Sequence, residues 1–108
     1  MTTKGDMPRE ERVLVRVAPE IAELIPGFLQ NRRKDIAAML DAVQGGDFET
    51  VRLLGHSMKG AGGGYGFDAI TEIGAALEEA AKQRNAAEIR GRVNELSRYL
   101  DRVEVISD

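Results

Sequence analysis

Four successive stretches of the chain carry apolar residues at intervals of three and four positions, and short polar breaks separate them. The stretches cover about residues 18–44, 48–61, 68–84 and 86–102. This spacing places the apolar side chains on one face of an α-helix, so each stretch predicts an amphipathic helix. Helices of this length joined by short loops pack as antiparallel neighbours. The pattern therefore predicts an all-α fold: an up-and-down antiparallel four-helix bundle with a short kinked N-terminal helical segment.

The predicted helix ends rest on residues that start or stop helices. Pro19 suits a first helical position, and Pro26 is expected to kink or restart the first helix. Asp47, after two glycines, is expected to cap the second helix, and Asp68 the third. Asn85 is expected to separate the last two helices. The residues expected to face the core are Phe28, Leu29, Ile36, Leu40 and Val43 in the first helix; Phe48, Val51, Leu54, Met58 and Ala61 in the second; Ile70, Ile73, Leu77, Ala80 and Ala81 in the third; and Ile89, Val93, Leu96 and Leu100 in the fourth.

The two ends of the chain have a different character from the helices. Residues 13–17 and 103–106 are rich in β-branched side chains, which favour extended backbone. The two segments are expected either to pair as a short ribbon beside the helices or to pack irregularly on them. We therefore divide the chain into an N-terminal tail, residues 1–17, that is partly extended, and a bundle domain, residues 18–108.

Composition excludes several classes of function. A chain of 108 residues forms one domain, and the absence of cysteine excludes disulfides and thiolate metal sites. A single histidine excludes a multi-histidine metal site within one chain. No apolar run approaches the ~20 residues that cross a bilayer, and residues 1–12 lack the apolar segment of a signal peptide. With a net charge of −3, we expect a cytoplasmic monomer without metal or cofactor that binds neither membrane nor nucleic acid.

The only histidine, His56, lies in the second predicted helix. At about 100° per residue it falls nearly opposite the apolar side of this helix, so its imidazole is predicted to face water. Arg52, Lys59, Gly60 and Gly63 share its face, because residues three and four apart are neighbours on a helix. The alternative for His56 is an ordinary surface histidine without a chemical role.

The residues beside this histidine indicate a chemical role. A glycine inside a helix costs about 1 kcal/mol relative to alanine, and Gly60 leaves open space one turn from the imidazole. A close helix crossing is the alternative reason for Gly60. Lys59 can direct an ammonium group at an anion attached to the ring. The combination suits a nucleophilic nitrogen presented to a bulky partner. Nucleotide binding is rejected, because a P-loop places its lysine after the glycines and follows a strand, whereas Lys59 precedes glycines 62–64.

The sequence His56-Ser57-Met58-Lys59-Gly60 resembles the H-x-x-K-G motif of histidine phosphotransfer (HPt) domains. The resemblance continues through residues 46–50, 65–67 and 76–78 and spans roughly residues 18–103. It implies a phosphorelay intermediate: a phosphoryl carrier, not an enzyme with kinase activity of its own. Such a carrier accepts a phosphoryl group on His56 from a receiver-domain aspartate or a sensor histidine kinase, and passes it to the receiver domain of another response regulator.

The resemblance also implies roles for single residues. Glu78, on the neighbouring helix, corresponds to a Gln or Glu that hydrogen-bonds the active imidazole, which would leave Nε2 as the nucleophile. Lys59 is expected to contact the phosphoryl group, and Gly60 to give access. The surface expected to dock partners comprises Arg52, Leu53, Gly63 and Lys82. Two alternatives stay open: a helical adaptor that binds a receiver without accepting phosphate, and a phosphoryl-accepting domain served directly by the ATP-binding domain of a chemotaxis-type kinase.

Overall fold

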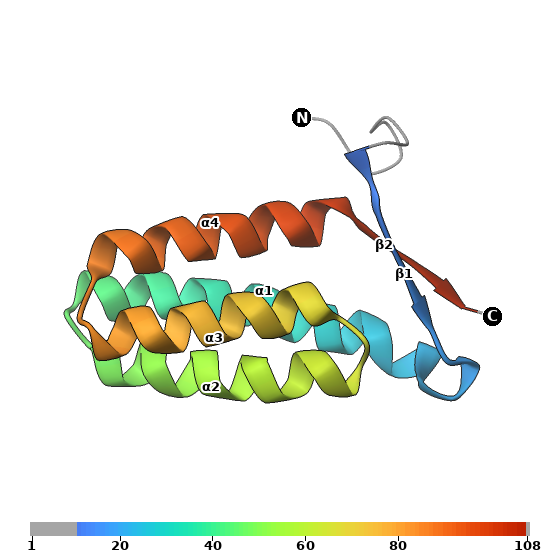
Figure 1. Ribbon diagram of the computed structural model, residues 1–108, viewed down its shortest axis with the longest axis horizontal. Helices are drawn as coiled ribbons and strands as arrows, with labels where there is room; N and C mark the ends of the chain where they lie inside the picture. The colour runs from blue at the N-terminus through green and yellow to red at the C-terminus, as the bar shows by residue number, and fades with distance from the viewer. Residues whose placement is uncertain (1–10, 108) are drawn as a thin grey trace.

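The computed structural model describes residues 11–107. Over this range four α-helices form the predicted antiparallel bundle, which confirms the expected fold class (Figure 1). They are α1 (Ile25–Gln44), α2 (Phe48–Gly64), α3 (Asp68–Lys82) and α4 (Ala86–Arg102). A 3₁₀-helix, η3 (Pro19–Leu24), precedes α1, and the strands β1 (Val13–Val17) and β2 (Val103–Ser107) lie together at one end of the bundle.

Three-residue loops join the four helices, and all three loops have the same geometry. The middle residue of each, Gly46, Gly66 or Arg84, has a positive φ. The third residue then donates its backbone N–H to a carbonyl five positions earlier, at 2.8 to 3.0 Å. This is the Schellman arrangement that ends helices at a left-handed residue, which glycine adopts most readily. In the third loop the guanidinium of Arg84 lies 4.7 Å from the ring centroid of Phe48, which ties this loop to the start of α2.

Of the two predicted caps, the one at Asp47 is confirmed; Asn85, expected only to separate the last two helices, is also an N-cap. Asp47 accepts the backbone N–H of Thr50 at 3.1 Å, and Asn85 accepts that of Glu88 at the same distance. The prediction that Asp68 caps the third helix is wrong by one position: Phe67 is the N-cap, and Asp68 is the first helical residue. There its charge still favours the positive end of the helix dipole. Pro19 and Pro26 lie in the first turns of η3 and α1, so the chain restarts at Pro26 as a new helix.

The core follows the predicted faces except on α1. All the residues expected to face inward on α3 and α4 are buried. On α1, Leu40 is 41% exposed, so its predicted core position is wrong, and Met39 is fully buried instead. Met39 lies three turns from Phe28 on one face of α1, whereas Leu40 is rotated by about 100° away from it. The ring of Phe28 stacks on two other rings: its centroid lies 4.5 Å from that of Tyr65 and 5.3 Å from that of Phe67.

The strands confirm the predicted ribbon and reveal its direction. β1 and β2 pair in parallel, with Val13 opposite Val103 and Val17 opposite Ser107. Val17 and Val103 are buried against the bundle. Part of the predicted tail, residues 1–10, lies outside the described residues. No helix between residues 11 and 107 combines the length and apolarity needed to cross a membrane.

Candidate functional site

His56 lies in the middle of α2 with its side chain directed to solvent. The side chain is 64% exposed, whereas Val51 and Met58, on the other side of α2, are fully buried. The amphipathic pattern of the helix therefore accounts for the exposure of the imidazole, as predicted from the sequence.

Helices α2 and α3 approach closely beneath His56, and glycines permit the approach. A Cβ on Gly74 of α3 would lie 2.6 Å from the backbone N of Lys59, and a Cβ on Gly55 of α2 would lie 2.8 Å from the backbone N of Glu78. A third glycine, Gly62, packs in the same way against Thr71. These distances are shorter than the 3.5 to 4.0 Å of an ordinary contact, so a larger residue at any of these positions would push the helices apart.

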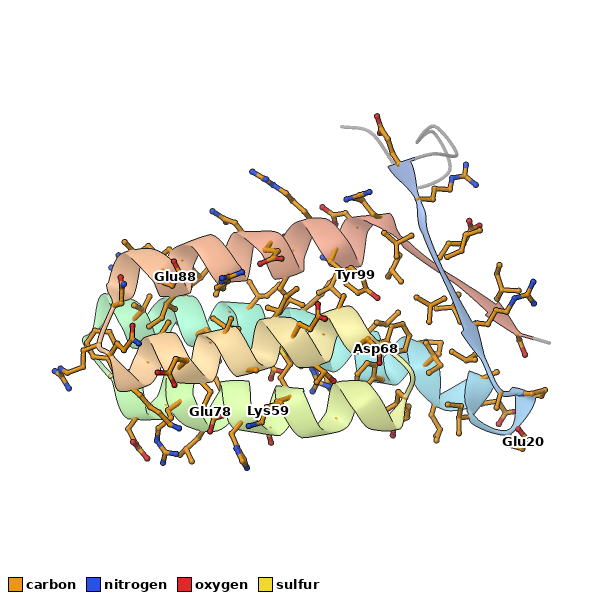
Figure 2. All side chains as sticks on the ribbon, in the orientation of Figure 1. Glu20, Lys59, Asp68, Glu78, Glu88 and Tyr99 are labelled. Atoms are coloured by element: carbon orange, nitrogen blue, oxygen red, sulfur yellow. The ribbon has the colours of Figure 1, made fainter. Side chains whose placement is uncertain are left out.

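The close approach brings Glu78 into contact with two side chains of α2, His56 and Lys59. Its Oε2 lies 3.0 Å from Nδ1 of His56, and its Oε1 lies 2.9 Å from Nζ of Lys59. Figure 2 shows Lys59 and Glu78 side by side where α2 meets α3. Glu78 is 8% exposed, the one charged residue that is buried within residues 11–107. Both of its oxygens have a partner, which satisfies a buried carboxylate.

The two contacts determine the charge of Glu78. The hydrogen bond from Lys59 lowers the pKa of the Glu78 carboxyl, burial opposes this, and the hydrogen bond with His56 lowers it further. The carboxylate is thus ionised at neutral pH and can only accept hydrogen bonds. In the neutral ring, Nδ1 must then carry the proton, and Nε2 keeps its lone pair. The site presents an exposed imidazole whose free nitrogen is the one farther from the backbone.

Lys59 differs in part from its predicted arrangement. It lies one turn from His56, as expected, but its ammonium group pairs with Glu78, a contact that the sequence reading missed. The Lys59 side chain remains 41% exposed. Thr71 of α3 donates its hydroxyl to the backbone carbonyl of Lys59 at 3.0 Å, which fixes this turn of α2 against α3.

Gly60 has open space around it. No atom of the described residues, apart from the local backbone of α2, lies within 4 Å of the place where its Cβ would stand. The packing alternative for this glycine is therefore wrong, and the helix crossing uses Gly55, Gly62 and Gly74 instead. One sequence signal could have identified those three: a glycine inside a helical pattern costs stability, so its presence indicates close packing.

The residues predicted to dock partners lie on two helices. Arg52 and Leu53 precede His56 on α2; Arg52 is bound to Glu49 by two hydrogen bonds, and the Leu53 side chain is 54% exposed. Gly63 lies toward the other end of α2, and a Cβ added to it would lie 3.6 Å from Oγ1 of Thr71. Lys82 is exposed in the last turn of α3. The structure thus places these residues on the surface of the two helices that form the site.

Metal-binding groups do not gather in the described part of the chain. Between residues 11 and 107 no three His, Asp or Glu side chains lie close enough to hold one metal ion.

One comparison with known proteins identifies a family. The family model described as "Hpt domain" matches residues 23–105. This span contains the four helices and all the residues of the site. No curated protein and no solved structure matches the chain.

Proposed function

Because the chain belongs to the Hpt domain family, whose members carry phosphoryl groups in phosphorelays, we propose that His56 accepts a phosphoryl group from a receiver-domain aspartate and passes it to a second receiver. A sensor histidine kinase is the other donor that we consider. The observation that carries the proposal is the 3.0 Å contact between His56 Nδ1 and the ionised carboxylate of Glu78.

The proposed transfer step uses the free nitrogen of the ring. The Nε2 lone pair attacks the phosphorus of the aspartyl phosphate, the bond between phosphorus and the aspartate oxygen breaks, and the aspartate leaves as a carboxylate. Nε2 gains a phosphoryl group while Nδ1 keeps its proton, so the ring becomes positively charged. Glu78 stabilises this charge through its hydrogen bond to Nδ1. The same interaction holds the ring in orientation before and after transfer.

Lys59 has a role in the charge change. A phosphoryl group brings between one and two negative charges to the ring nitrogen. We propose that Lys59 then divides its hydrogen bonds between Glu78 and the phosphoryl oxygens, since its exposed ammonium group has three donors. Because the site is open to water, this contact stabilises the phosphorylated state by no more than about 1 kcal/mol.

Access to Nε2 is the proposed role of Gly60. The space beside it would be occupied by a partner, because a receiver must bring its aspartate within bonding distance of an imidazole on a convex helix. Leu53, an exposed apolar side chain close to His56, is proposed to lie in the docking surface with Arg52, Gly63 and Lys82.

The test is phosphoryl transfer in a defined mixture. A receiver domain charged by a small phosphodonor is mixed with the protein, and ³¹P NMR is used to detect phosphohistidine and its ring position. We expect acid-labile, alkali-stable phosphate on Nε2 of the wild type and none on His56→Gln, with both proteins equally folded.

Two outcomes would contradict the proposal. Equal histidine-type labelling of His56→Gln would exclude His56 as the acceptor. Receiver binding without labelling of the wild type would instead support an adaptor. A parallel mixture with ATP and a sensor kinase, but no receiver, identifies direct phosphorylation by a kinase.

A further inference from the structure

Few polar side-chain contacts join α3 to the rest of the bundle. Among residues 11–107, three hydrogen bonds or ion pairs of side chains link α3 to another helix, and all three go to α2. Two of them are the contacts of Glu78 with His56 and Lys59. The third is the hydrogen bond from the Thr71 hydroxyl to the backbone carbonyl of Lys59, at 3.0 Å. Over this range Thr71 therefore makes the one such link that is not itself a contact of Glu78.

The position of Glu78 along α2 decides whether it can make both of its contacts. His56 and Lys59 are three residues apart, which is about 4.5 Å along the helix axis. The Glu78 oxygens reach Nδ1 of His56 at 3.0 Å and Nζ of Lys59 at 2.9 Å. A slide of α3 along α2 by about 1 Å changes these two distances in opposite directions, so one contact is weakened. The site therefore requires a fixed register between the helices as well as a short distance.

The glycine contacts beneath the site set the distance between the helices rather than their register. Side chains that interlock as ridges and grooves normally resist the sliding of packed helices. At Gly55 and Gly74 the backbone of one helix lies directly against the backbone of the other. These contacts allow close approach, but they place no interlocking side chain at the points where α2 and α3 are nearest.

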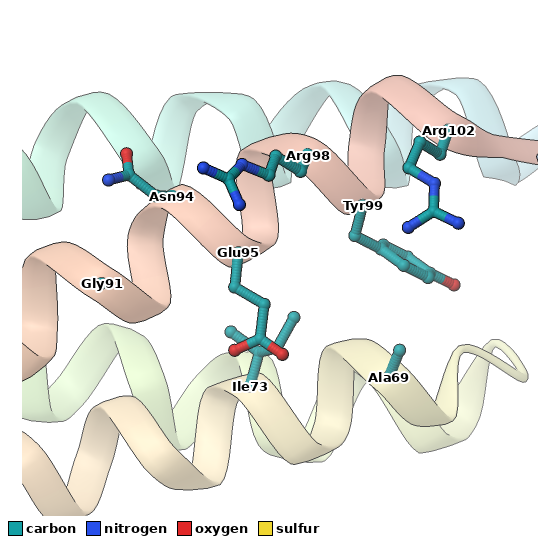
Figure 3. Close-up of a pocket in the computed structure, with 8 residues that line it drawn as sticks. All are labelled: Ala69, Ile73, Gly91, Asn94, Glu95, Arg98, Tyr99 and Arg102. Carbon is teal, nitrogen blue, oxygen red and sulfur yellow. The ribbon is translucent and has the colours of Figure 1, made fainter. Parts of the chain in front are cut away.

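Helix α4 leaves space beside the turn of α3 that contains Thr71. A hollow of about 510 Å³ lies between α3 and α4, and Ala69 and Ile73 of α3 line it (Figure 3). Thr71 is two residues from each of them, about 200° around the helix, so it lies on the other side of α3. There it packs against Gly62 of α2, where an added Cβ would lie 2.7 Å from the backbone N of Thr71. The tight contact at this turn is therefore with α2.

The Thr71 hydroxyl is directed across the boundary between the two helices. Inside a helix, a threonine hydroxyl can donate to a carbonyl one turn earlier in its own helix. A hydroxyl has one proton, and here that proton goes to Lys59 of α2. A backbone carbonyl has two lone pairs, so Lys59 can accept this bond in addition to one within α2. The bond is therefore directional and specific to one position along α2.

We propose that Thr71 is a positioning residue for the site, because its hydrogen bond to the Lys59 carbonyl sets the register of α3 along α2. Glu78 lies seven residues further along α3, two turns on and on the same face, at about 10.5 Å. The hydrogen-bonded helix between them transmits the register to the Glu78 carboxylate, which then holds the proton of His56 on Nδ1. This role depends on the proposed function of His56 only where phosphoryl transfer is measured.

The test compares two variants that both lack the threonine methyl group. Thr71→Ser keeps a hydroxyl and Thr71→Ala removes it, so the difference between them isolates the hydrogen bond. ¹⁵N NMR of the ring, without phosphate, measures the ratio of the Nδ1–H to the Nε2–H tautomer of His56. We expect a ratio close to that of the wild type in Thr71→Ser and a ratio about two- to tenfold lower in Thr71→Ala. The change cannot exceed the free energy of the hydrogen bond that is removed.

The titration of Glu78 provides a second readout. In the wild type the hydrogen bond from Lys59 lowers the pKa of the Glu78 carboxyl, burial opposes this, and the bond with His56 lowers it further. Loss of register weakens these contacts, so this pKa should rise toward its ordinary value in Thr71→Ala and stay low in Thr71→Ser, as measured by ¹³C NMR of the carboxyl. Phosphoryl transfer should slow about two- to tenfold in Thr71→Ala and be unchanged in Thr71→Ser.

Thr50 provides a matched control. Its hydroxyl donates to Asp47 at 2.6 Å, at the start of α2. Thr50→Ala removes a hydroxyl hydrogen bond, as Thr71→Ala does, but should leave the tautomer ratio and the Glu78 titration at their wild-type values. Thr71→Val, which keeps the branched shape without the hydroxyl, should behave like Thr71→Ala and replaces it in the comparison if Thr71→Ala is unfolded. Thermal unfolding checks that each variant is folded.

Three results would overturn the role of Thr71. They are equal tautomer ratios in Thr71→Ser and Thr71→Ala, a wild-type ratio in Thr71→Val, and an equal change in Thr50→Ala, which would attribute the effect to general stability. A wild type that accepts no phosphoryl group would contradict the proposed function, and the tautomer ratios would still decide the role of Thr71. A wild type that transfers, with an unchanged ring in Thr71→Ala, would overturn the role of Thr71 alone.

Discussion

Replacing Gly74 with alanine adds a methyl group where α2 and α3 are closest. The new Cβ would lie 2.6 Å from the backbone N of Lys59 and 2.9 Å from the carbonyl oxygen of Gly55. Neither backbone atom can rotate away as a side-chain end could. An ordinary contact needs about 3.5 Å, so the helices must separate locally by about 1 Å.

This separation should affect stability and the site together. Overpacking costs about 1–3 kcal/mol, and the better helix propensity of alanine returns up to about 1 kcal/mol. Glu78 lies one turn beyond Gly74, so a shift of about 1 Å would stretch its 3.0 Å contact with His56 Nδ1 beyond hydrogen-bonding distance. We expect a less stable protein in which the imidazole has lost its preferred tautomer.

Gly91→Ala is the matched control. Gly91 lies inside α4, and no atom of the described residues beyond the local helix backbone is within 4 Å of its Cβ position. Both variants gain the same helix propensity, so the difference between their free energies of unfolding isolates the overpacking, about 1–3 kcal/mol. Denaturant unfolding measures this difference, and ¹⁵N NMR of the ring reports the tautomer. Phosphoryl transfer should slow in Gly74→Ala and be unchanged in Gly91→Ala.

Equal stability of the two variants would refute the reasoning, because it would mean that α2 and α3 are not in tight contact at Gly74. A less stable Gly74→Ala with an unchanged tautomer would show that the ring orientation does not depend on the helix spacing.

Four other predictions concern single positions. Gly60→Ala should stabilise the protein by up to about 1 kcal/mol, as expected for Gly91→Ala, yet slow phosphoryl transfer. Unfolding and transfer assays on both variants check this. An unchanged transfer rate in Gly60→Ala would exclude an access role. Lys59→Ala should reduce the lifetime or yield of phosphohistidine by no more than about fivefold, measured by ³¹P NMR, and a complete loss would contradict a purely supporting role. The folded pKa of Glu78 lies below its ordinary value of 4.5, so its contribution to stability is present above that value and is lost as pH falls through the folded pKa. The stability difference between the wild type and Glu78→Gln should therefore shrink on acidification below about pH 4.5. A pH-independent difference would exclude the linkage. Asp47→Ala should cost about 1 kcal/mol in denaturant unfolding, since its carboxylate caps α2.

Local sequence patterns were enough to predict the helices and the exposure of His56. Caps such as Asp47 and Asn85 act on backbone groups two or three residues away, so the sequence around them contains both partners. The exposure of His56 follows from the 3.6-residue period of α2 alone. The position of Glu78 beside the ring was implied by a family resemblance, because periodicity cannot relate residues 22 positions apart on different helices.

The tertiary structure decided everything that depends on two helices at once. A glycine in a helix has the same sequence appearance whether it gives a partner access, as proposed for Gly60, or admits a neighbouring helix, as Gly74 does. Met39 rather than Leu40 is buried because α1 packs against two helices whose positions its own sequence does not contain. Lys59 pairs with Glu78 for the same reason: the ion pair exists only because backbone contact between α2 and α3 brings the two side chains to 2.9 Å. Periodicity determines which face of a helix is apolar, but the close distance between α2 and α3 is set by Gly55, Gly62 and Gly74, which carry no side chain at the contact.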